Sequence, residues 1–136
     1  MPHSPEFRLR VKARAEDIDE LKHVSNLVYV RWMQDAALAH STSVGWNAAA
    51  YVGAGAVFVA RRHEIDYLAS AVEGDEVEIT TWVESFTAAS SVRQYRMVRV
   101  ADQRELVRAQ TTWVFVSLRS GRPQRIPAEI AQAFAG

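Results

Sequence analysis

The stretch "EDIDELKHVSN", residues 16–26, stands directly before the apolar segment "LVYVRWMQDAALAHSTSV", residues 27–44. Ser25 is a favourable helix N-cap, and Gly45 is a typical helix stop. Only four polar or charged residues interrupt the apolar segment before its polar tail. A helix that is apolar on nearly every side has to be enclosed by the rest of the protein. The sequence therefore predicts a central, buried helix with a loop of titratable residues at its entrance.

The sequence around this helix is typical of β-structure. Residues 7–13 alternate apolar and basic side chains, as a strand with one exposed face does. A linker of small residues, 45–56, follows the helix, with room for one short helical turn. Four strand-like runs come next, and short turn signals separate them. These runs are residues 57–69, 75–85, 91–100 and 105–118. A last segment, 127–136, fits a short helix that begins after Pro127 and ends at Gly136.

This order of elements predicts an α+β fold with two layers, one helix against one curved antiparallel sheet. Because short turns join the four long strands, we expect them to form a meander. The length of 136 residues suggests one domain spanning residues 1–136. An open sheet leaves edges to protect. We therefore expect a homo-oligomer, dimer or tetramer, built by edge-to-edge pairing.

The composition excludes several classes of function. The chain has no cysteine, so disulfides, thiolate metal sites and cysteine nucleophiles are absent. Sixteen basic residues balance sixteen acidic ones, so no overall field favours nucleic acid or an anionic membrane. The first ten residues lack the apolar run of a secretory signal, and the apolar stretches are too short to span a bilayer. We expect a cytoplasmic protein without nucleic-acid or membrane partners.

The loop before the helix suggests acyl-transfer chemistry. The first turn of a helix has N–H groups without partners and a partial positive charge, which favour a developing oxyanion. A carboxylate just upstream can act beside it as nucleophile or general base. A thiolate leaves without much help because its conjugate acid has a pKa of roughly 8.5. Thioesters therefore fit this minimal apparatus better than amides do.

Other interpretations of the same loop remain open at this point. Asp and Asn before a helix commonly form caps and Asx-turns, and a neighbouring His is often structural. A metal site is a further alternative, with Asp17, Asp19 and His23 as ligands. However, no other cluster of His or carboxylate residues completes a ligand shell, so we expect neither a metal nor another cofactor.

The stretch "DIDELKHVSNLVYVRW", residues 17–32, resembles the D-x-D-x-x-x-H-V-x-N-x-x-Y signature of hot-dog fold acyl-CoA thioesterases. It is similar to the 4-hydroxybenzoyl-CoA thioesterase family and to plant acyl-ACP thioesterases. Residues 65–79 and 111–127 are similar to later strands of the family, so the resemblance covers essentially the whole chain. It implies a long helix wrapped by a curved antiparallel sheet, with dimers that pair edge to edge and often form tetramers. The matching residues are Asp17, Asp19, His23, Val24, Asn26 and Tyr29.

The resemblance also assigns roles to individual residues. It implies that Asp19 is the catalytic carboxylate and that the backbone N–H of Asn26 polarises the thioester carbonyl. His23 matches a histidine that orients or assists, and Tyr29 matches a residue that lines the site. The sequence departs from the family pattern at five places. Lys22 stands for the usual glycine, Ser25 for the first asparagine, Leu21 for an asparagine of the plant enzymes, Gln34 for a helix glutamate and Ala71 for a common proline.

Two substrate-binding regions are predicted. An apolar channel is expected for the acyl group, and the small residues at 48–56 are expected to form a wall or a lid of this pocket. Its candidate lining is Tyr29, Trp32, Met33, Trp46, Tyr51 and Phe58, although ordinary core packing is the better interpretation for Trp32 and Met33. The CoA phosphates are expected to bind guanidinium groups. The candidates are Arg61 and Arg62 on a strand and Arg119, Arg122 and Arg125 in the tail loop, which we favour; solvated surface charge is the alternative for each.

The sequence therefore predicts an acyl-CoA thioesterase that acts on acyl-CoA or acyl-ACP. The alternatives are a hot-dog enoyl-CoA hydratase or dehydratase and a non-catalytic acyl-CoA binding protein. The sequence leaves open the acyl group, the carrier, and whether Asp19 attacks the carbonyl or activates water.

Overall fold

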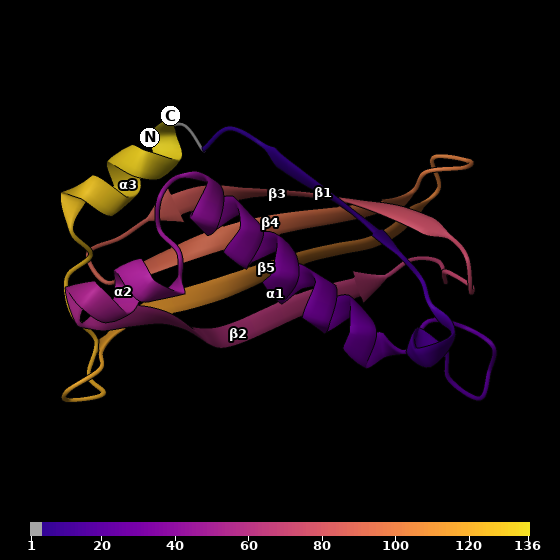
Figure 1. Ribbon diagram of the computed structural model, residues 1–136, viewed down its shortest axis with the longest axis horizontal. Helices are drawn as coiled ribbons and strands as arrows, with labels where there is room; N and C mark the ends of the chain where they lie inside the picture. Colours follow the sequence, from indigo (N-terminus) through magenta and orange to yellow (C-terminus); the bar gives the residue numbers. More distant parts are fainter. Residues whose placement is uncertain (1–3) are drawn as a thin grey trace.

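The computed structural model describes residues 4–136. Figure 1 shows one curved layer of strands, with a long helix lying across it and shorter helices at one end. The layer is a single five-stranded sheet. The elements are β1 (Phe7–Lys12), a 3-10 turn η1 (Ala15–Asp17), α1 (Asn26–Ser43), α2 (Ala48–Ala54), β2 (Ala56–Tyr67), β3 (Glu76–Phe86), β4 (Ser90–Arg99), β5 (Glu105–Ser117) and α3 (Ala128–Ala135). The predicted α+β architecture is confirmed.

The strands lie in the order β1-β3-β4-β5-β2, and each pair is antiparallel. β3, β4 and β5 form a meander as predicted, but the prediction that β2 continues it was wrong. β2 pairs with β5 and occupies one edge of the sheet. Residues 68–75 therefore connect one edge to a strand on the other side of the sheet. This segment is held beneath the entrance of α1, where the N–H of Ala71 donates to the Tyr29 hydroxyl at 2.9 Å.

Helix α1 begins where the sequence predicts. The Ser25 side chain caps it by accepting from the N–H of Leu27, and the chain leaves the helix at Gly45 with a φ of 95°. One face of α1 packs on the sheet and is buried. The other face is not enclosed within one chain, because Leu27 and Leu38 are 80% and 53% exposed. The buried residues of α1 are Val28, Tyr29, Trp32, Met33, Ala36, His40 and Ser41.

The two short helices close one end of the sheet (Figure 1). The linker of small residues forms a full helix, α2, because the Asn47 side chain caps its N-terminus and Gly55 ends it in the left-handed conformation, φ 79°. α3 follows Pro127 as predicted, and its Ile130 and Phe134 are buried against Phe115 of the sheet. No helix among residues 4–136 combines the length and apolar character that crossing a membrane requires.

The two edges of the sheet differ in length and chemistry. β1 is six residues long, and its exposed side chains are the cations Arg8, Arg10 and Lys12. β2 is twelve residues long, and its middle is exposed, with Val59 at 42%. A β-bulge at Arg61 interrupts the pairing of β2 with β5. Charged, short edges resist further pairing, whereas a long edge with exposed apolar residues invites it.

Candidate active site

The loop between η1 and α1 is a tight, closed turn. Ile18 and Val24 form an isolated antiparallel bridge. Inside it, the N–H of Asp19 donates to the His23 carbonyl at 2.9 Å, and the N–H of Lys22 donates to the Asp19 carbonyl at 3.0 Å. Lys22 has a φ of 67°, the left-handed region that favours glycine. The glycine that the resemblance leads one to expect at this position would adopt this conformation without strain.

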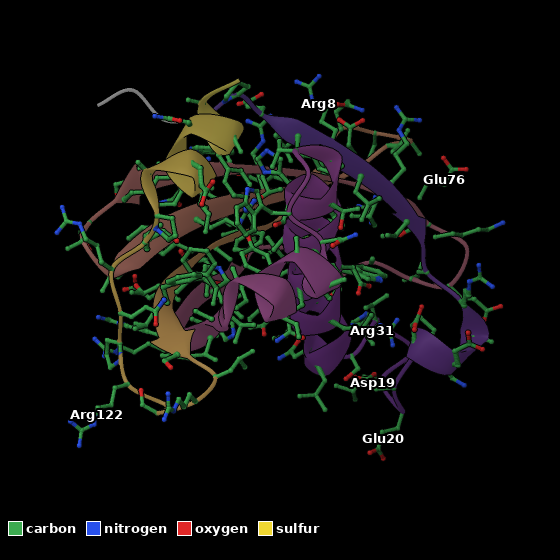
Figure 2. All side chains as sticks on the ribbon, turned by 60° about the vertical axis from the view of Figure 1, so that its left-hand side comes forward. Arg8, Asp19, Glu20, Arg31, Glu76 and Arg122 are labelled. Atoms are coloured by element: carbon green, nitrogen blue, oxygen red, sulfur yellow. The ribbon has the colours of Figure 1, made fainter. Side chains whose placement is uncertain are left out.

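Asp19 lies in the loop that leads into the N-terminus of α1, and its side chain and that of Glu20 point in different directions (Figure 2). Its side chain is partly exposed. Oδ1 accepts from the N–H of Leu21 at 2.9 Å, which makes an Asx-turn. Oδ2 meets no hydrogen-bond donor within residues 4–136. The structural and the chemical interpretations of Asp19 are thus compatible, because one oxygen holds the turn and the other remains available.

The N-terminus of α1 offers a free donor close to this turn. The N–H groups of Leu27 and Val28 donate to the side chain and the carbonyl of Ser25. The N–H of Asn26, the first helical residue, meets no acceptor in the part of the chain that the structure describes. The helix dipole adds a partial positive charge at the same place. A carbonyl oxygen bound here would have its developing negative charge stabilised.

Asp17, the other carboxylate of the motif, is structural. It is 3% exposed, and its two oxygens accept from the Arg14 N–H at 2.9 Å and from Arg31 Nη2 at 2.8 Å. Burial alone would raise the pKa of Asp17, but the Arg14 N–H and the Arg31 guanidinium outweigh burial and lower that pKa. Asp17 therefore ties the loop to the second turn of α1 as an ionised carboxylate.

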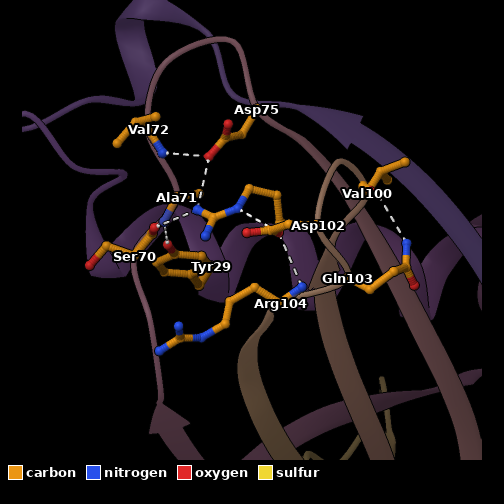
Figure 3. A network of polar contacts seen from close by, with 10 residues as sticks. Tyr29, Ser70, Ala71, Val72, Asp75, Val100, Asp102, Gln103 and Arg104 are labelled. Carbon is orange, nitrogen blue, oxygen red and sulfur yellow. Dashed lines mark hydrogen bonds and ion pairs between the residues drawn. The ribbon is translucent and has the colours of Figure 1, made fainter.

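A second set of contacts holds the loop from beneath. The N–H of Val24 donates to the carbonyl of Ala71 at 2.9 Å, so the loop is attached to the connection between β2 and β3. Arg99, on β4, fixes this connection through the Ser70 carbonyl at 3.3 Å and the Asp75 carboxylate at 3.4 Å. Figure 3 shows how this network joins the connection, the Tyr29 hydroxyl and the turn between β4 and β5. The position of the loop is therefore set by residues far away in sequence.

The remaining residues of the predicted catalytic motif have different environments. His23 is exposed at the loop surface. Tyr29 is buried, and the N–H of Ala71 uses its hydroxyl as an acceptor, so the structure places it in the core below the loop. Tyr67, at the end of β2, reaches the carbonyl of Asn26 with its hydroxyl at 3.5 Å. The roles of His23 and Tyr29 in catalysis or binding stay predictions.

The predicted phosphate-binding arginines lie away from Asp19 within one chain. Arg122 is at the opposite end of the molecule from Asp19 in Figure 2. Arg122 and Arg125 are exposed in the loop that follows β5, where the N–H of Ser117 donates to the Arg122 carbonyl at 2.9 Å. Arg61 is exposed at the bulge of β2. One chain thus does not bring these arginines and Asp19 together.

A cavity of about 260 Å³ lies between the C-terminal half of α1, α2, α3 and the sheet. Of the six residues predicted to line an acyl channel, Tyr51 and Phe58 line this cavity. Trp32 and Met33 are core residues, 3% and 0% exposed, as the preferred interpretation had it. The sequence interpretation missed Arg93, a buried charged residue of the lining. Its signal was present, because Arg93 shares one strand face with Tyr95 and Met97.

The metal alternative finds no support in the geometry. Within residues 4–136, no three His, Asp or Glu side chains are grouped so that they could hold a metal ion. Asp17 already uses both oxygens within the protein.

Comparison with known proteins agrees with this fold. Residues 13–134 match the model of the thioesterase-like superfamily. A 1,4-dihydroxy-2-naphthoyl-CoA thioesterase from Synechocystis has a similar structure, with a TM-score of 0.88, 18% identity and coverage of 96% of each chain. A putative oleoyl thioesterase from Lactobacillus plantarum has a TM-score of 0.92 and 14% identity over 96% of this chain. A 12:0-ACP thioesterase from Umbellularia californica has a TM-score of 0.83 and 24% identity over 95% of this chain. The last two matches cover 51% and 50% of those longer chains. The chain therefore belongs to the thioesterase-like superfamily and has its hot-dog fold, which confirms the family and the class of thioester hydrolase predicted from the sequence.

Proposed function

We propose that this protein hydrolyses an acyl thioester of CoA or acyl carrier protein, with Asp19 and the N-terminus of α1 as its reactive centre. The observation that carries the proposal is the available Oδ2 of Asp19 in a turn that precedes the unpaired N–H of Asn26. Structurally similar proteins include a CoA thioesterase and a 12:0-ACP thioesterase, which supports both carriers.

The chemistry follows from these two groups. The thioester carbonyl oxygen accepts from the Asn26 N–H, which stabilises the charge that develops on it. Either Asp19 attacks the carbonyl carbon and forms a mixed anhydride that water then cleaves, or Asp19 takes a proton from an attacking water. In both routes the C–S bond breaks, the thiolate leaves, and one water molecule is consumed. Free acid and thiol are the products.

The active protein is proposed to be a dimer that pairs through β2. The edge strand β2 is long and exposed, whereas β1 is short and charged. Two identical strands related by a two-fold axis pair antiparallel. Such pairing would also cover Val59 of β2, which one chain leaves 42% exposed.

This dimer also brings separated parts of the site together. At one end of β2, Val57 and Phe58 line the cavity. At the other end, Tyr67 contacts Asn26. Antiparallel pairing of two copies of β2 lays the first end of one strand beside the second end of its partner. The cavity of one protomer, and the nearby loop with Arg122 and Arg125, then lie beside the Asp19 loop of the other.

A thioester panel tests the proposal directly. Thiol release is measured for a series of acyl-CoA and acyl-ACP substrates, with an enoyl-CoA hydration assay run in parallel. Thioester hydrolysis without hydration is the expected result; hydration without hydrolysis would overturn it. A single turnover in H2¹⁸O then tests the covalent route, because a product acid without label, with the label left on Asp19, identifies attack by Asp19 itself. Labelled acid fits both the general-base route and an anhydride that water opens at its acyl carbon.

A further inference from the structure

Arg93, in the middle of β4, is a charged residue in the protein interior, with 5% of its surface exposed. Its Nη1 lies 2.9 Å from His40 Nδ1 and donates to Thr81 Oγ1 at 3.1 Å. Its Cζ lies 5.5 Å from the centre of the Phe134 ring. Burial, with the nearby Arg93 charge, lowers the pKa of His40 to about 4. The imidazole is therefore neutral at pH 7, and its Nδ1 accepts from Arg93.

The charge of Arg93 is not neutralised by the protein around it. No ion pair among residues 4–136 includes Arg93. A guanidinium has five N–H donors. In the described part of the chain, only those on Nη1 find acceptors, and both acceptors are neutral. Buried charges are normally paired because desolvating an unpaired one is costly. The site therefore lacks an anion.

The space for an anion adjoins Arg93. Arg93 belongs to the lining of the 260 Å³ cavity, and the other lining residues are apolar, aromatic or neutral polar side chains. Leu38 and Val52 belong to the lining and are 53% and 61% exposed, so the cavity is accessible from the surface. A ligand that enters there meets apolar walls first and one buried guanidinium. This pattern suits an apolar chain that carries a negative charge at its far end.

We propose that this cavity receives the acyl part of the thioester and that Arg93 binds a carboxylate at the end of that acyl chain. This inference rests on the proposed function and names its substrate class as the thioester of a dicarboxylic acid. A guanidinium and a carboxylate form two parallel, charge-assisted hydrogen bonds. The cavity lies just below the range of about 300–1,000 Å³ typical of pockets for drug-sized ligands, so the chain it holds is short.

The cavity and the reactive centre are connected through the proposed dimer. Within one chain, the helical rise places Ser41 of the lining about 22 Å along α1 from Asn26. The antiparallel pairing of β2 places the cavity of one protomer beside the Asn26 end of the other. The acyl chain would then leave the carbonyl at one protomer and end at Arg93 of the second. Arg93 is accordingly a specificity-determining residue.

A matched set of substrates tests the carboxylate. The rates compared are kcat/KM for adipoyl-CoA, its neutral monomethyl ester and hexanoyl-CoA, all with a six-carbon acyl chain. We expect the wild type to prefer adipoyl-CoA over both neutral substrates by at least tenfold in kcat/KM, because one charge-assisted hydrogen bond is enough to give a preference of this size. Arg93→Met should remove that preference while it retains hydrolysis of hexanoyl-CoA. Arg96→Met, an exposed arginine on the same strand, is the control and should keep the wild-type preference.

Several outcomes would overturn the inference. Equal rates for all three substrates in the wild type contradict it. So does an equal loss on all three in Arg93→Met, since that shows a purely structural arginine. If Arg93→Met does not fold, Arg93→Lys, which keeps the charge, must retain a preference for adipoyl-CoA.

The binding of free adipate separates this inference from the proposed function. Adipate binding is measured by calorimetry, with dimethyl adipate, which has no carboxylate for Arg93 to bind, as the neutral comparison. Tight adipate binding that Arg93→Met abolishes, together with no thioester hydrolysis at all, would support the carboxylate site and refute the proposed reaction. Hydrolysis without any adipate binding or adipoyl preference would refute the carboxylate site alone.

Discussion

Arg31 Nη2 lies 2.8 Å from Oδ1 of Asp17, and this ion pair joins the second turn of α1 to the loop that carries Asp19. Asp17 is buried, while Arg31 is 55% exposed. The ion pair therefore holds the loop against α1, with Arg31 at the helix surface and Asp17 buried in the loop. Its loss should affect folding and the placement of Asp19 together.

We predict that Asp17→Asn lowers the free energy of unfolding by about 1–3 kcal/mol, because a buried, charge-assisted pair is broken. The pKa of Asp17 is lowered in the folded protein from an ordinary value of 3.8. The stabilisation is thus present above that value and is lost as the pH falls through the lower, folded pKa. Urea unfolding at pH 7 and at a pH below the folded pKa of Asp17 measures this. A wild type and a variant that differ equally at both pH values would contradict the prediction.

Above the pH range in which Asp17 titrates, the pH dependence of the free energy of unfolding should come from His40. Burial and the Arg93 charge lower the pKa of His40 from 6.5 to about 4. The unfolded chain then binds a proton more readily than the folded protein between these values, so stability falls as the pH drops from 6.5 toward 4. Between pH 7 and pH 5 we expect a loss of about 2 kcal/mol. His40→Gln, which keeps an acceptor for Arg93, should flatten this slope in urea titrations; an unchanged slope assigns the effect to another group.

The left-handed conformation of Lys22 predicts an unusual pattern of substitutions. Lys22 has a φ of 67°. This conformation costs a residue with a Cβ roughly 1–2 kcal/mol, unless its side chain makes a local hydrogen bond that offsets the strain. Lys22→Gly should therefore leave stability unchanged or raise it by up to about 1 kcal/mol, since glycine loses more entropy on folding. Lys22→Val, which is β-branched, should destabilise the protein. Thermal unfolding of the two variants gives the comparison, and a more stable valine variant would show that the turn is not in this conformation.

The dimer through β2 is tested by placing a charge on that edge. Val59→Glu should yield a monomer in light scattering. This monomer should still be folded, as its thermal unfolding shows, and should have lost most of its thioesterase activity. Lys12→Glu, on the opposite edge strand β1, is the matched control and should remain a dimer. An active monomeric Val59→Glu, or a control that dissociates instead, would contradict pairing through β2.

The sequence predicted the elements well because their signals are local. The cap at Ser25 and the stop at Gly45 marked the ends of α1, and alternation marked the strands. The place of β2 beside β5 was not predicted, since alternation shows which face a residue occupies and not which strand lies next to it. The connection at 68–75 contains a genuine turn at Gly74, which suggested a hairpin, but its position depends on Tyr29 and Arg99 far away in sequence.

The candidate site was predicted in part. The motif singled out Asp19 and Asn26, which the fold places at one end of α1 and whose catalytic roles stay predictions. It did not distinguish the structural role of Asp17, whose partner Arg31 lies fourteen residues later and becomes a neighbour only when the helix forms. Arg93 was not predicted, because the alternation of β4 does not by itself show that a single charged side chain lies on its inward face. The loop after β5, which carries Arg122, lies at the opposite end of the molecule from the entrance of α1 (Figure 2).

The central claim is that the Asp19 carboxylate carries out the chemistry. The most direct measurement is the rate of thiol release from acyl-CoA by the wild type and by Asp19→Asn, each shown to be folded and in the same oligomeric state. Asparagine keeps an oxygen for the Leu21 N–H but lacks the negative charge, so we predict a loss of about 10²–10⁴-fold in kcat with unchanged thermal unfolding. Turnover by Asp19→Asn at the wild-type rate would show that this carboxylate only closes its turn.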